Sequence, residues 1–113
     1  MHEYAVTKNI VDIAVEEAQK AGAAKITDIR LVIGDLSSII DESVQMYFDI
    51  ISEGTIAQGA KLSFRRVPAK FKCPSCGLVY DKPHKGFDCP VCGIPGFLTG
   101  GGKEFYIESM EVD

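Results

Sequence analysis

The chain has 113 residues, of which 46% are hydrophobic and 25% are charged, with a formal net charge of -4 at pH 7. These values are ordinary for one folded domain, or for one domain with a small module. No apolar run approaches the roughly 18 residues of a membrane-spanning helix. The acidic balance argues against nonspecific nucleic-acid binding, which needs cations at the phosphates.

The chain begins with a predicted helix followed by a predicted strand. Residues 3–21 place apolar side chains on one broad face, as in a helix packed on a sheet, and Gly22 is a natural stop. Residues 25–33 alternate between apolar and polar positions toward their end, which favours a strand.

A second predicted helix and strand follow. Residues 41–53 carry an apolar stripe, flanked by Met46, that we assign to the core. We expect Asp41 to cap the start of this helix and Gly54 to end it. Residues 60–67 alternate again as a strand.

The rest of the chain predicts a module inserted into a small domain. Residues 69–102 contain all the cysteines and end in three glycines that indicate a flexible exit. Residues 104–112 return to strand character, with Met110 in the core, and would rejoin the first sheet. We therefore predict an α+β fold with two helices packed on a small mixed β-sheet. Its domain spans residues 1–68 plus 103–113, and a zinc-ribbon-like module spans 69–102.

The four cysteines form two copies of one pattern, which is the strongest motif in the sequence. Two C-x-x-C pairs at this spacing are typical of a tetrahedral zinc site, and four thiolates leave no open position for substrate. Glycine after each pair permits a positive φ, so that backbone N–H groups of the turn face the sulfurs. Rubredoxin-like iron and dithiol redox chemistry use related patterns and stay open as alternatives. The expected zinc ligands are Cys73, Cys76, Cys89 and Cys92.

The opening residues Met1, His2 and Glu3 form a second candidate metal site. The α-amine, the backbone amide nitrogen and the imidazole of His2 can wrap one ion in fused chelate rings, and a carboxylate can complete the plane. Nitrogen-rich square-planar coordination suits Ni²⁺ or Cu²⁺. On chemistry alone, a solvated histidine without a ligand role is the commoner outcome.

The whole chain resembles the HypA/HybF family of nickel metallochaperones, which serve the maturation of [NiFe]-hydrogenase. The resemblance includes the opening Met1-His2-Glu3, the Ile33-Gly34-Asp35-Leu36 segment, the Glu53 to Leu62 turn and the paired cysteine motifs, in that order. It implies that nickel binds at the N-terminus with His2 as the key ligand, and that zinc binds the four cysteines. Asp41 falls near the position where some family members place an acidic residue close to nickel, but the local alignment is loose there, and we favour the capping role for Asp41.

The resemblance also implies partners, namely the nickel-handling GTPase HypB and a hydrogenase large subunit. No catalytic constellation indicates an enzyme, and we expect neither nucleic acid nor membrane as a partner, and either a monomer or a homodimer. The first residues lack the basic and apolar regions of a signal peptide, so we expect a cytoplasmic protein. His84, between the cysteine pairs, is expected to be a solvated loop residue. A nucleic-acid-binding zinc ribbon and a rubredoxin-like iron carrier remain the alternative functions.

Overall fold

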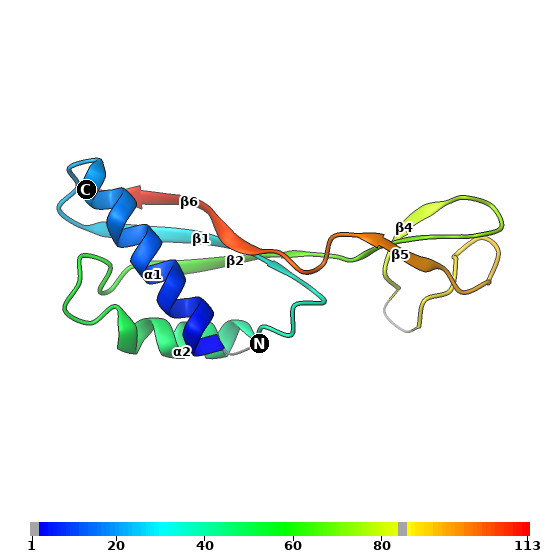
Figure 1. The fold of residues 1–113 in the computed structure, drawn as a ribbon, viewed down its shortest axis with the longest axis horizontal. Helices are drawn as coiled ribbons and strands as arrows, with labels where there is room; N and C mark the ends of the chain where they lie inside the picture. The colour runs from blue at the N-terminus through cyan, green and yellow to red at the C-terminus, as the bar shows by residue number, and fades with distance from the viewer. Residues whose placement is uncertain (1–2, 84–85) are drawn as a thin grey trace.

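The computed structural model describes residues 3–83 and 86–113. The molecule is elongated, with extents of 54 × 24 × 17 Å. It has two helices and two three-stranded sheets, and Figure 1 shows the helices with the larger sheet at one end and the smaller sheet at the other. Among the described residues, no helix has the length and apolar character needed to cross a bilayer.

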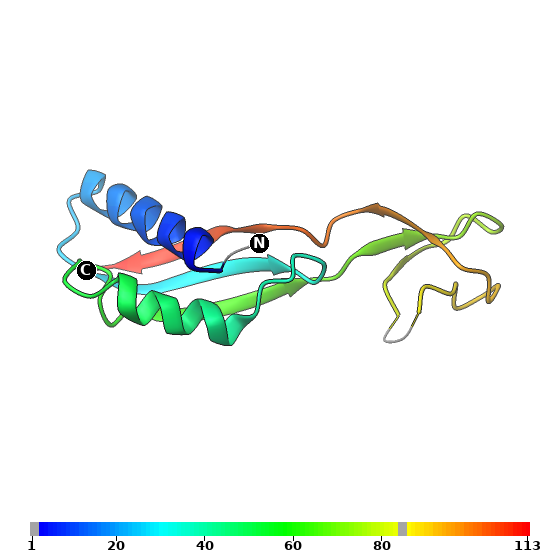
Figure 2. The same ribbon diagram turned by 60° about the horizontal axis from the view of Figure 1, so that its bottom comes forward.

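The larger sheet is mixed, as the sequence predicts. Strand β1 (Ile26–Gly34) lies in the centre, parallel to β2 (Lys61–Val67) and antiparallel to β6 (Phe105–Val112). Helices α1 (Glu3–Lys20) and α2 (Asp41–Ile51) lie side by side along this sheet (Figure 2). The predicted α+β fold class, with the final strand returning to the first sheet, is therefore confirmed.

One continuous hydrophobic core joins the two helices to the larger sheet. Alternate residues of β1, including Ile29, Leu31 and Ile33, are buried against apolar residues of α1 and α2. Met110 packs against the same core, as predicted. Cross-strand ion pairs from Arg30 to Glu111 and from Arg65 to Glu108 join neighbouring strands of the sheet.

The smaller sheet is built from three short strands. Strand β3 (Lys70–Lys72) lies between β4 (Val79–Asp81) and β5 (Phe97–Gly100), with both neighbours antiparallel to it. Strand β5 is short and fully exposed, so it lacks the alternation of buried and exposed side chains that identifies a strand in sequence.

The glycines between β5 and β6 form a close backbone contact with the larger sheet. The N–H of Leu36 donates to the carbonyl of Gly102 at 2.6 Å, and the N–H of Gly34 donates to the carbonyl of Glu104 at 2.7 Å. Gly102 is buried against Ala69 and Leu36 with φ near +86°. The prediction of a flexible exit is wrong for Gly102, which is buried and hydrogen-bonded and where an added Cβ would crowd Ala69 and Leu36 at 3.1 Å.

Two predictions for α2 are also wrong. Asp41 is not the N-cap: that position is Ile40, which makes no side-chain cap hydrogen bond. Asp41 instead accepts a hydrogen bond from Arg66 on β2 at 2.6 Å, a contact across 25 residues of chain. Met46 is 50% exposed rather than in the core. The side of α2 that faces the sheet decides that Met46 is exposed and that Asp41 meets Arg66. The sequence of the helix does not specify that side.

Candidate metal centres

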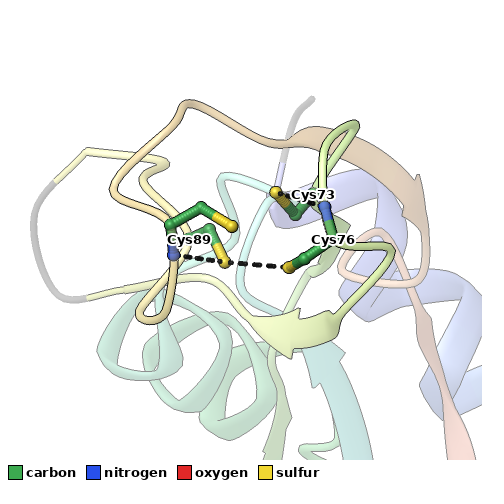
Figure 3. Close-up of side chains that lie close together, drawn as sticks. Cys73, Cys76 and Cys89 are labelled. Atoms are coloured by element: carbon green, nitrogen blue, oxygen red, sulfur yellow. Dashed lines mark hydrogen bonds between the residues drawn. The ribbon is translucent and has the colours of Figure 1, made fainter.

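The four cysteines of the chain converge at the far end of the smaller sheet. Their sulfur atoms all lie within 4.8 Å of one another, and those of Cys76 and Cys89 are 3.7 Å apart. Figure 3 shows these two sulfurs pointing toward each other from the two turns. In each pair the first cysteine is buried and the second is exposed.

Each cysteine pair lies in a tight turn whose backbone faces the first sulfur. The N–H groups of Ser75 and Cys76 approach the Cys73 sulfur at 3.4 and 3.5 Å. In the second turn two N–H groups approach the Cys89 sulfur, both at 3.4 Å. The glycine after each pair has a φ above +70°, which L side chains rarely adopt. The predicted role of these glycines is confirmed.

The electrostatics of the cluster favour a bound cation. Hydrogen bonding from the Cys76 N–H, with that from Ser75, lowers the pKa of the Cys73 thiol to about 7. The neighbouring sulfurs, that of Cys76 foremost, raise the pKa of the Cys92 thiol to about 12. Four thiolates at such short range repel one another, and a divalent ion removes that repulsion.

The donor set fits tetrahedral thiolate coordination. Zn–S bonds of about 2.3 Å in a tetrahedron require sulfurs about 3.8 Å apart, and the Cys76–Cys89 separation of 3.7 Å already meets this distance. Among the described residues this is the only group of three or more potential ligands gathered closely enough to hold an ion. Four cysteine ligands would complete a tetrahedral coordination shell and leave no open position for substrate.

Aromatic side chains pack beside the cysteine cluster and form a small core with its buried cysteines. The rings of Phe71 and Phe87 stack with centroids 5.3 Å apart, and the Tyr80 hydroxyl donates to the Phe87 carbonyl at 2.5 Å. Leu36, from the loop after β1, packs against this small core. The sequence motif Ile33-Gly34-Asp35-Leu36 therefore has a structural role that sequence reasoning missed. Its glycine permits the backbone contact and its leucine reaches the cysteine module.

The predicted nickel site lies mostly outside the described residues. Met1 and His2 are outside them, as is His84. Glu3 is the first residue of α1 and is half-buried. The next residue, Tyr4, meets Tyr47 of α2 edge-on, with ring centroids 5.5 Å apart. The start of α1 is thus held against α2. The C-terminal end of α1 lies at the end of the larger sheet that is farther from the smaller sheet (Figure 1).

Comparison with known proteins identifies the family. A family model described as "Hydrogenase/urease nickel incorporation, metallochaperone, hypA" matches residues 1–112. The chain belongs to the HypA family. A curated relative, hydrogenase maturation factor HypA of Caldanaerobacter subterraneus subsp. tengcongensis, is 52% identical with all of both chains aligned. The protein of the same name from Geobacter sulfurreducens is 34% identical, again with full coverage of both.

Solved HypA structures share the fold. The solution structure of the Ni metallochaperone HypA from Helicobacter pylori matches with a TM-score of 0.65 and 24% identity, covering 99% of this chain and 97% of that one. A second HypA solution structure gives a TM-score of 0.69 with similar coverage. As a member of the HypA family, the chain is a hydrogenase maturation factor of the metallochaperone class. Such a protein carries a metal and is not an enzyme.

Proposed function

We propose that this HypA protein binds Ni(II) at its N-terminus and delivers it for the maturation of [NiFe]-hydrogenase. The observation that carries the proposal is the family match over residues 1–112, together with curated relatives that are named hydrogenase maturation factors. The ligands proposed are the α-amine of Met1, the backbone nitrogen and imidazole of His2, and the carboxylate of Glu3.

A site at the start of a chain suits a metal carrier. Its ligands belong to a short segment, so a partner reaches the ion and the ligands release it without any change in the core. The position of Glu3 at the first turn of α1, beside the Tyr4–Tyr47 contact, supports this site.

We propose that the cysteine centre holds a structural Zn(II) ion. Support comes from the closed four-sulfur donor set and from the small size of the core that surrounds it. Among the described residues that core has five buried members, two of them cysteines, which is too few to hold three short strands without a metal. A zinc-loaded protein is colourless, whereas ferric thiolate is red, so the colour of the purified protein distinguishes zinc from rubredoxin-like iron.

The proposed partners and compartment follow from membership in the HypA family. We propose HypB and the hydrogenase large subunit as protein partners and the cytoplasm as the compartment. We propose that the domain of residues 1–68 plus 103–113 binds nickel and that the module of residues 69–102 binds zinc. This division is supported by two hydrophobic clusters, one around the larger sheet and one around the cysteines.

Nickel titration of the untagged protein tests the proposed site. We expect micromolar binding that is lost in His2→Ala, and lost when extra residues precede Met1, because both changes remove a nitrogen ligand. Zinc content, measured by metal analysis, is expected to stay the same in both variants. Nickel affinity is expected to fall below a pH of about 6.5, where imidazole protonates. Unchanged nickel affinity in the N-terminally extended protein would show that the amine is not a ligand.

A further inference from the structure

Helix α2 presents an acidic face with an apolar strip to solvent. Met46 and Ile50 are 50% and 60% exposed, although the opposite side of the helix buries Val44 and Phe48. Residues four apart lie one above the other on a helix, so Met46 and Ile50 form one strip. Three exposed carboxylates flank the strip, and none of them pairs with a basic side chain within the described part of the chain. We call this set the α2 outer face, and it comprises Glu42, Met46, Asp49, Ile50 and Glu53.

The smaller sheet presents an exposed face on which lysines lie beside apolar side chains. Opposed residues of neighbouring strands share a face, and Lys72 on β3 is opposed by Val79 on β4 and by Phe97 on β5. Val79 and Phe97 are 56% and 50% exposed. Lys70 lies two residues away along β3 and therefore on the same face, where it forms an ion pair with Asp81. Lys72 forms no ion pair with the described residues. We call this set the basic sheet face, and it comprises Lys70, Lys72, Val79 and Phe97.

The two faces complement each other in charge and in apolar content. Each face exposes two large apolar side chains, which carboxylates flank on α2 and lysines flank on the smaller sheet. Contact of α2 with α2 would bring carboxylates against carboxylates, and contact of sheet with sheet would bring lysines against lysines. Pairing the α2 outer face with the basic sheet face covers all four apolar side chains and joins opposite charges.

The shape of the molecule places this contact between two copies. Helix α2 packs along the larger sheet, whereas the smaller sheet lies at the other end of a molecule 54 Å long (Figure 1), so the two faces do not meet within one copy. When two elongated copies lie side by side in opposite directions, each α2 comes beside the smaller sheet of the other copy. Both contacts then form around one two-fold axis, and the assembly closes at two chains.

We propose that two copies of this chain associate in this antiparallel manner, with the α2 outer face of each on the basic sheet face of the other. Tyr4 packs edge-on against Tyr47, so the first turn of α1 rests on α2. In the dimer, the cysteine module of one copy therefore lies beside the α2 on which the other copy's first turn rests. That turn begins the segment that we propose to carry nickel. The association itself does not require nickel, so the nickel titration judges the proposed function separately.

Sedimentation equilibrium of the zinc-loaded protein, with exchanged charges on the two faces, tests the dimer. The α2 variant combines Asp49→Lys and Glu53→Lys, and cations near a helix C-terminus leave α2 stable. The sheet variant combines Lys70→Glu and Lys72→Glu. In each variant alone the two faces carry the same sign, whereas in an equimolar mixture the altered face of one variant meets the altered face of the other with opposite signs. The unaltered faces also pair in such a mixed dimer.

Two further sets of variants support this comparison. The matched control is Glu16→Lys with Glu17→Lys on α1, which makes the same change of charge at exposed positions outside both faces. Ile50→Ser tests the apolar part of the contact without a change of charge. Ile13→Ser is its control, because Ile13 is 51% exposed on α1. Zinc content should match the wild type in every variant, which shows that the cysteine module remains folded.

We expect each charge variant to weaken dimerisation by about 30-fold or more, and Ile50→Ser by about 5-fold, because every altered face occurs twice in the dimer. The α1 controls should change it by less than about 2-fold, and the equimolar mixture should recover an affinity within about 5-fold of the wild type. A wild-type protein that stays monomeric at about 1 mM would overturn the proposal. So would a mixture that does not reassociate, a dimer that persists in both charge variants, or equal weakening by the α1 controls.

Discussion

Gly34 lies where the larger sheet touches the chain segment that returns from the cysteine module. A Cβ atom added at this position would lie 2.1 Å from the carbonyl carbon of Gly102 and 2.4 Å from the nitrogen of Lys103. Both neighbours are backbone atoms, so no side chain can rotate to make room. Gly34→Ala must therefore push the two segments apart.

The cost follows from the contacts at this junction. Separating the segments breaks the hydrogen bonds from Gly34 to Glu104 and from Leu36 to Gly102. Each such bond contributes about 1 kcal/mol, and overpacking a buried site costs about 1–3 kcal/mol more. We expect Gly34→Ala to lower the free energy of unfolding by about 3–5 kcal/mol, equivalent to a fall in Tm of about 12–20 °C.

Urea and thermal unfolding of the zinc-loaded protein, followed by circular dichroism, measure this change. Gly54→Ala is the matched control, because Gly54 has φ near +80° but nothing within 4 Å of the added Cβ. Its cost is limited to backbone strain of about 1–2 kcal/mol. If Gly34→Ala is no more destabilising than Gly54→Ala, the junction is not tightly packed and the reasoning fails.

Three further predictions concern single side chains. Arg66→Ala should lower stability by about 1–2 kcal/mol in urea unfolding, because Arg66 binds the Asp41 carboxylate and the Ile39 carbonyl from a half-exposed position; no change would mean that neither bond matters. Thr7→Val should raise stability by about 1 kcal/mol, since the buried Thr7 hydroxyl has no partner among the described residues; a loss of stability would reveal a hidden partner. Zinc binding near neutral pH should release protons, because the pKa of Cys92, raised to about 12, keeps that thiol protonated before the metal arrives. Zinc affinity should therefore rise with pH, and calorimetry in buffers of different ionisation enthalpy would refute this if the heat did not depend on the buffer.

The cysteine pairs show how much a local pattern can predict. Both cysteines of each pair lie in one tight turn, so the spacing alone determines that two sulfurs face the same way. The positive φ of Gly77 and Gly93 follows from the same local geometry. The two turns then meet because the intervening chain is short. Such a site is encoded within about twenty residues and is visible in the sequence.

Met46 shows where a local pattern misleads. The apolar residues of α2 cover a wider part of the helix surface than the part that is buried. The periodicity of the sequence does not indicate which of these apolar residues are buried. The sheet accepts only the side bearing Val44 and Phe48, and it leaves Met46 and Ile50 in solvent. The exposure of Met46 and Ile50 is therefore decided only by tertiary packing.

By itself the sequence determined the order of the two helices and of the strands of the larger sheet, the family resemblance and the pairing of the cysteines within tight turns, because each depends on residues that are close in the chain. The tertiary structure alone decided which side of α2 is exposed, that Asp41 pairs with Arg66 instead of capping a helix, and that Gly102 is packed against Leu36. Each of these joins residues at least 25 positions apart. Their contact depends on how the sheet brings distant segments together, and no local spacing records it.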